Sequence, residues 1–202
     1  MRRRVVTAAA VALVVAPVAF AAAERPTITA QTTVVSNTTP LILTGTIPGG
    51  AGERVEIEAK DCRSMFFRLV GAAPTGTGGN WTYQGGIMAN TTFRATWKNA
   101  VSNEVEVKQR IFVSLVRRSP RALVATVVTS HQRMIGRTVR LERFTADGGW
   151  RLLQRAKLRR LAGPTTEARF LVRRKGMQLR AVIDTANAQP CHVAGISTIL
   201  RS

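Results

Sequence analysis

The chain has 202 residues, a formal net charge of +19 and 45% hydrophobic residues. This length holds one large domain or two small ones, and the charge indicates either an anionic partner or a strongly solvated surface. There are only two cysteines and two histidines, and neither histidine has an acidic neighbour at helical or strand spacing. Catalytic and metal-binding clusters need such groups together, so we expect no enzyme activity, no metal and no cofactor.

Residues 1–23 have the layout of a secretory signal peptide. Arg2, Arg3 and Arg4 precede an apolar run over residues 5–20, and small residues that suit a signal peptidase follow at 21–23. The apolar run is shorter than the roughly 20 residues of a membrane-spanning helix, and Pro17 interrupts it. We expect cleavage near residues 21–23, no transmembrane span in the mature chain, and a secreted or extracytoplasmic location in the cell envelope.

Short segments of alternating apolar and polar residues follow the signal peptide. In residues 54–59 Val55 and Ile57 share one face while the charged residues share the other, and residues 92–97, 103–107, 139–141 and 179–183 alternate in the same way. Glycine-rich turns lie between these segments, for example at 76–80 and 147–149. One-sided alternation is typical of half-buried antiparallel strands. We therefore predict an all-β fold.

One pattern of residues occurs twice. Each copy has a glycine, two alternating apolar residues and, after a gap, an arginine that follows an apolar residue. The members are Gly52, Val55, Ile57, Phe93 and Arg94 in the first copy, and Gly136, Val139, Leu141, Leu179 and Arg180 in the second. The glycine and the arginine are 42 residues apart in one copy and 44 in the other. Such self-similarity predicts one unit built twice: two antiparallel β-sandwiches, residues 24–109 and 110–202, joined by a short, stiff linker around residues 108–110.

Short motifs around this repeat carry a resemblance to a known family. They are Leu41-x-Leu43-x-Gly45, Gly52-x-x-Val55, Phe93-Arg94-Ala95 and Val101-Ser102-Asn103-x-Val105 in the first copy, and Gly136-x-x-Val139, Gly148-Gly149-Trp150, Leu179-Arg180-Ala181 and Gly195-Ile196-Ser197 in the second. The mature chain resembles the tandem immunoglobulin-like (fibronectin-type-III-like) repeats of secreted bacterial proteins, especially those of high-GC actinobacteria. The resemblance implies a non-enzymatic stalk, adhesion module, or carbohydrate- or wall-associated domain. Ser197 follows Arg180 by 17 residues whereas Ser102 follows Arg94 by 8, which predicts an insertion within residues 184–194.

Cys62 and Cys191 leave three alternatives open. An exported protein with two cysteines ordinarily forms one disulfide. However, Cys62 follows a strand of the first copy and Cys191 lies in the insertion of the second. We expect these two loops at the same end of their sandwiches, about a domain length apart, whereas a disulfide needs Cα atoms within about 7 Å. Either the domains fold back and form an intrachain disulfide, or the thiols stay free, or they link a dimer.

The positive charge is concentrated in the second copy. Residues 24–109 carry 8 basic and 7 acidic residues, whereas residues 110–202 carry 19 basic and 4 acidic ones. The candidate anion-binding residues are Arg151, Arg155, Lys157, Arg159, Arg160, Arg173, Arg174 and Lys175. Arginine suits bidentate pairing with phosphate, sulfate or carboxylate. A genomic preference for arginine is the alternative, but it would enrich both halves.

These observations predict an exported, non-enzymatic interaction or structural protein of the cell envelope. Its basic second domain would contact an anionic wall polymer, a lipid head group or an acidic protein surface. Specific nucleic-acid binding is not expected, because the second domain has few aromatic residues for base stacking and no recognition helix. The alternative is a carbohydrate-binding accessory module that uses an exposed tryptophan.

Overall fold

The computed structural model describes residues 25–36, 39–129, 134–173 and 176–202. The predicted signal peptide, residues 1–23, lies outside the described residues. Within these ranges the chain is almost entirely β-structure, so the all-β prediction is confirmed. No helix of the described part is long and apolar enough to cross a bilayer.

Strands β1–β9, here called the N-terminal unit, form two sheets. Their bounds are β1 Thr29–Ala30, β2 Val34–Val35, β3 Leu41–Thr46, β4 Arg54–Asp61, β5 Arg68–Pro74, β6 Asn80–Gly85, β7 Thr91–Trp97, β8 Ala100–Val101 and β9 Val105–Gln109. One sheet has the order β1-β3-β6, and the other has the order β2-β9-β7-β4-β5 with β8 beside β7. The predicted alternation places Val55 and Ile57 of β4 in the core, where they pack in one cluster with Leu43 of β3 and Trp81 of β6.

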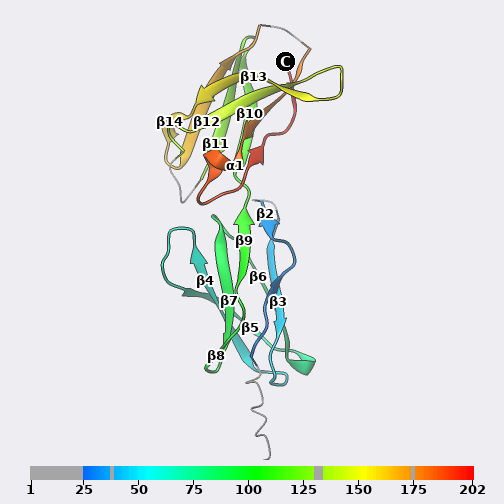
Figure 1. The fold of residues 1–202 in the computed structure, drawn as a ribbon, viewed down its shortest axis with the longest axis vertical. Helices are drawn as coiled ribbons and strands as arrows, with labels where there is room; N and C mark the ends of the chain where they lie inside the picture. The colour runs from blue at the N-terminus through cyan, green and yellow to red at the C-terminus, as the bar shows by residue number, and fades with distance from the viewer. Residues whose placement is uncertain (1–24, 37–38, 130–133, 174–175) are drawn as a thin grey trace, which may run out of the picture.

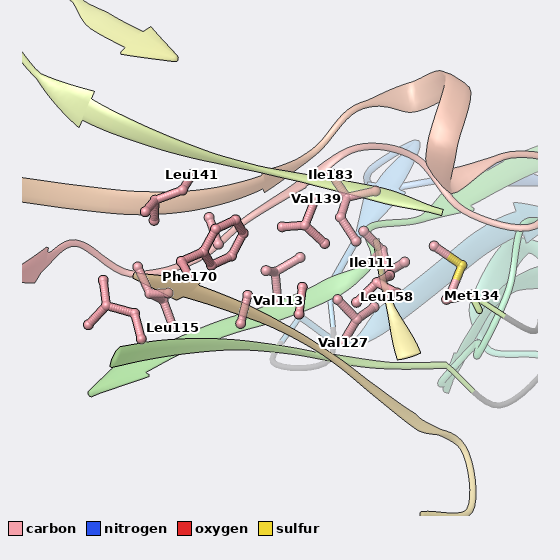
Figure 2. Close-up of a cluster of buried hydrophobic side chains, with 14 of the residues drawn as sticks. Ile111, Val113, Leu115, Val127, Met134, Val139, Leu141, Leu158, Phe170 and Ile183 are labelled. Carbon is pink, nitrogen blue, oxygen red and sulfur yellow. The ribbon is translucent and has the colours of Figure 1, made fainter. Parts of the chain in front are cut away.

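Strands β10–β18, the C-terminal unit, form two further sheets. The elements are β10 Phe112–Ser119, β11 Ala122–Val128, β12 Thr138–Phe144, β13 Trp150–Lys157, β14 Arg159–Ala162, β15 Thr165–Leu171, β16 Gln178–Ile183, helix α1 Thr185–Ala188, β17 Gly195–Ile196 and β18 Leu200–Arg201. The strand orders are β10-β11-β15-β14 and β13-β12-β16-β17, with β18 beside β16. Figure 2 shows side chains from both sheets meeting in one core, among them Leu115, Leu141 and Phe170. The two sheets therefore pack face to face.

The two copies of the sequence pattern occupy equivalent positions in the two units. Gly52 and Gly136 both have positive φ angles, 85° and 81°, a conformation that favours glycine. The Oγ of Ser102 accepts a hydrogen bond from the amide of the alanine that follows the repeat arginine, at 2.8 Å, and Ser197 does the same in the second unit at 2.9 Å. The 17-residue spacing in the second copy thus leads back to the same bond after the insertion.

The repeat arginines also make the same ion pair in each unit. Arg94 on β7 lies 2.6 Å from Glu58 on the neighbouring strand β4, and Arg180 on β16 lies 2.9 Å from Glu142 on the neighbouring strand β12. Each arginine also stacks on an aromatic ring, Phe67 for Arg94 and Trp150 for Arg180. Both pairs lie on the outer face of their sheet, opposite the core.

A two-residue connection joins the units, which stack end to end (Figure 1). The amide of Arg110 donates to the carbonyl of Val35 in the N-terminal unit at 2.8 Å. The amide of Ile111 donates to the carbonyl of Val193 at 3.2 Å, and the amide of Val193 donates to the carbonyl of Gln109 at 2.9 Å. Because the connection is bonded on both sides, it holds the two units in one orientation.

The insertion at residues 184–194 forms the rest of this junction. It begins with α1 and ends against the N-terminal unit, where the amide of Asn90 donates to the carbonyl of Cys191 at 2.7 Å. The side chain of Asn90 donates to Pro190 O at 3.0 Å and accepts from the amide of Gln109 at 2.9 Å. His192 is buried, with its Nε2 3.2 Å from the carbonyl oxygen of Met88. The insertion is therefore a clasp between the two units.

Cys62 and Cys191 are joined in a disulfide within the chain, with Cα atoms 5.2 Å apart. The intrachain alternative is confirmed, and the predictions of free thiols and of a disulfide-linked dimer are wrong. The expected separation of the two loops was mistaken because β12 and β16 pair antiparallel, so the loops that follow them lie at opposite ends of the unit. In an end-to-end stack the loop after β4 and the loop after β16 then meet at the junction, and the units need not fold back.

Candidate anion-binding surface

The densest run of basic residues lies on two consecutive edge strands of the C-terminal unit. β13 is the edge of one sheet and β14 is the edge of the other. Arg155 and Lys157 are exposed on β13, and Arg159 and Arg160 are exposed on β14. Leu158, which is buried, lies between them where the chain crosses from one sheet to the other. The crossing places these four cations, here called the edge cluster, along one border of the unit.

The strand register sets the direction of the cluster's side chains on β13. Ala156 lies opposite Val139, a core residue, so the residues on either side of Ala156 face away from the core. Arg155 lies opposite Arg140, and Lys157 lies opposite Thr138. Cations therefore project outward at this edge from two neighbouring strands.

Other arginines occupy every carboxylate in residues 110–202. The pairs are Glu142 with Arg140 and Arg180, Asp147 with Arg151, Glu167 with Arg169, and Asp184 with Arg140. Glu167 lies opposite Arg159 in the ladder, but its Oε1 is 2.9 Å from Arg169. Among the described residues, no member of the edge cluster has a carboxylate within ion-pair distance. Its charge is thus left for solvent or for a ligand.

The remaining predicted candidates do not join the edge cluster. Arg151 lies at the opposite end of β13, where its Nη2 is 2.6 Å from Asp147 Oδ2. A hydrogen bond with Thr145 and then the one with Arg151 lower the pKa of Asp147. Arg173 is exposed at this same far end, where it lines a hollow together with Arg143. Arg174 and Lys175 lie outside the described residues. The eight predicted residues therefore divide between two places instead of forming one patch.

Arg140 belongs to the surface although the sequence did not single it out as a site residue. It lies between Glu142, at 3.4 Å, and Asp184, at 3.6 Å. The pKa of Asp184 is lowered first by a hydrogen bond from the side chain of Asn187, and the positive charges of Arg140 and Arg155 lower it further. Its alternation with the buried Val139 and Leu141 marks Arg140 as outward-facing, but only the ladder shows Arg155 beside it.

The three tryptophans are already engaged with other side chains. Trp81 is buried in the N-terminal core. Trp97 donates to Glu53 at 3.3 Å and has the Lys98 ammonium over its ring, 4.2 Å from the centroid. Trp150 has the Arg180 guanidinium 4.2 Å from its ring centroid, and it meets Phe144 edge to face. These contacts compete with a sugar ring for the faces of Trp97 and Trp150.

No protein-family model matches this sequence, and a search of curated proteins gives no significant match.

Proposed function

We propose that this chain is an exported, non-enzymatic interaction protein of the cell envelope whose C-terminal unit binds an anionic polymer through the edge cluster. On this proposal the chain consists of two immunoglobulin-like sandwiches in tandem, residues 24–109 and 110–202, preceded by a signal peptide at residues 1–23. The separate buried clusters of the two units and the matching Arg–Glu pairs support the tandem assignment.

The observation that carries the binding proposal is the uneven use of charge. All four carboxylates of residues 110–202 pair with arginines outside the edge cluster, and the four cations of the cluster lie together without such partners. A row of guanidinium groups on a strand edge matches the repeated charges of a polyanion, because each fork binds a phosphate, sulfate or carboxylate bidentately. Lys157 adds a point charge to the row.

The N-terminal unit acts as a near-neutral spacer in this proposal. Its 8 basic and 7 acidic residues give it almost no net charge. The clasp and the two-residue connection support a fixed angle between spacer and binding unit. A carbohydrate module that stacks sugars on tryptophan receives less support, because Trp81 is buried and the rings of Trp97 and Trp150 have cations over them.

Heparin chromatography of the full chain tests the proposal. The edge variant replaces Arg155, Lys157, Arg159 and Arg160 with Gln. A matched control replaces Arg117, Arg118, Arg121 and Arg201 with Gln and removes the same charge from four exposed residues of the same unit. We expect the edge variant to elute at clearly lower salt than the control variant, because clustered charges contribute more to polyanion binding than scattered ones. Equal elution of the two variants would show that retention follows net charge alone.

A further inference from the structure

The loop between β4 and β5 exposes two large apolar side chains at its tip. Met65 is 84% exposed and Phe66 is 74% exposed. Three further apolar residues nearby are also exposed, Leu69 and Val70 on β5 and Met88 after β6. We call these five residues the loop patch. Contiguous exposed apolar patches on soluble proteins mark interaction sites more often than single exposed residues do.

The loop is held in place on both sides of its apolar tip. Cys62, in the disulfide, anchors its start. The carboxylate of Asp61 accepts hydrogen bonds from the amides of Arg63 and Ser64, each at 2.9 Å. The Ser64 hydroxyl donates to the carbonyl of Phe66 at 2.8 Å. These bonds fix the backbone that displays Met65 and Phe66.

A second anchor follows the tip. The ring of Phe67 has the Lys60 ammonium 4.7 Å and the Arg94 guanidinium 4.1 Å from its centroid. Phe67 thus packs against cations of the sheet while the preceding residue, Phe66, points to solvent. A loop ordered in this way loses little conformational entropy on binding, which favours a docking role.

Cations flank the apolar tip. Arg63 precedes it and Arg68 follows it, and both line a cavity of about 510 Å³ together with Val70, Tyr83 and Met88. Neither arginine has an ion pair with a described residue. The surface therefore combines a convex apolar tip with positive charge at its base, the pattern that binds an interface with anionic head groups above acyl chains.

We propose that the loop patch docks on an anionic lipid surface, with Met65 and Phe66 inserted below the head groups and Arg63 and Arg68 on the lipid phosphates. A bilayer needs no shape complementary to a protruding tip, whereas a protein partner would need a matching pocket. The inference rests on the proposed function for its compartment, but it uses the N-terminal unit and none of the edge cluster. The two sites together would hold the protein between a lipid surface and an anionic polymer.

Flotation of the full, disulfide-bonded chain with vesicles tests the inference. The probes are vesicles of phosphatidylcholine alone and of phosphatidylcholine mixed with phosphatidylglycerol. The loop variant is Met65→Ser/Phe66→Ser, and the control Leu171→Ser/Ile199→Ser removes two exposed apolar residues of the C-terminal unit. We expect binding to the anionic vesicles to weaken on the order of tenfold or more in the loop variant, since burial of each side chain is favourable, and to stay within about twofold in the control.

A Phe66→Trp variant reports insertion directly. We expect lipids brominated in the acyl chain to quench its fluorescence more than that of the wild type. Absence of this extra quenching, or equal vesicle binding by the loop variant and the wild type, would overturn the inference. Heparin elution separates the two proposals: vesicle binding lost through the loop variant with unchanged elution supports both, and elution that ignores the edge cluster overturns only the proposed function.

Discussion

Cys62 and Cys191 are 129 residues apart in the chain, and their disulfide ties the loop after β4 to the insertion that distinguishes the second copy of the repeat from the first. The position where the two copies differ most is thus the position where they are joined. Asn90 lies beside this bond and hydrogen-bonds both sides of the junction. We infer that the insertion converts two similar units into one rod.

Replacement of both cysteines by Ser is expected to lower the free energy of unfolding by about 2–4 kcal/mol, because the bond closes a long loop in the unfolded chain. Chemical denaturation measures this loss, and the reduced wild-type chain serves as the control. Small-angle X-ray scattering should show a broader distribution of inter-unit distances. Intact mass before reduction should be two hydrogens below that of the reduced monomer, and a full-mass monomer would contradict the pairing.

Gly195→Ala is expected to disturb the junction without touching either core. A Cβ at this position would meet the backbone carbonyl oxygen of Ile111 and its Cγ2. Because backbone cannot move aside cheaply, we expect a loss of about 1–3 kcal/mol in unfolding free energy. Gly86→Ala, which has no atom within 4 Å of the new Cβ, is the matched control. Equal stability of the two variants would show that the contact at Gly195 is relieved by a small shift.

The fold was predictable where hydrophobic periodicity is strong. Alternation in β4 and in β12 places Val55 and Val139 in the cores, as expected from the sequence. The position of the disulfide was not, because it depends on which ends of two separate sheets meet, and periodicity carries no information about that. The site was only partly predictable. Arg155 and Arg159 are neighbours in sequence and in space, but Arg151, at the other end of the same strand, pairs with Asp147 instead.

The repeat ion pairs are expected to differ in strength. Glu142 lies between two arginines, and its side chain is 11% exposed, whereas Glu58 contacts one arginine and is 23% exposed. Glu142→Gln would leave two cations facing each other in a poorly solvated place, so we expect a loss of about 2–3 kcal/mol. For Glu58→Gln we expect about 1 kcal/mol. Urea unfolding of both variants checks the order, and a larger loss at Glu58 would contradict it.

Asp184 predicts a pH dependence of stability. The hydrogen bond from Asn187 and the charges of Arg140 and Arg155 lower its pKa in the folded chain below the ordinary value of 3.8. Because the folded pKa is depressed, the ionised group stabilises the fold above the unfolded pKa, and this contribution is lost as the pH falls through the folded pKa. Asp184→Asn keeps a capping side chain and removes the charge.

The stability difference between the wild type and Asp184→Asn should therefore be constant above about pH 5 and shrink at lower pH. Denaturant unfolding at a series of pH values measures it. A difference that grows on acidification would mean that the carboxylate is destabilised in the fold.

The central claim is that a polyanion binds the edge cluster, and arginine footprinting of the wild-type chain tests it most directly. Phenylglyoxal is added with and without heparin, and the modification of each arginine is measured by mass spectrometry of its peptide. We expect heparin to protect Arg155, Arg159 and Arg160 strongly and to leave the equally exposed Arg117, Arg118 and Arg121 nearly unprotected. Equal protection of both groups, or protection of the second group alone, would contradict the claim.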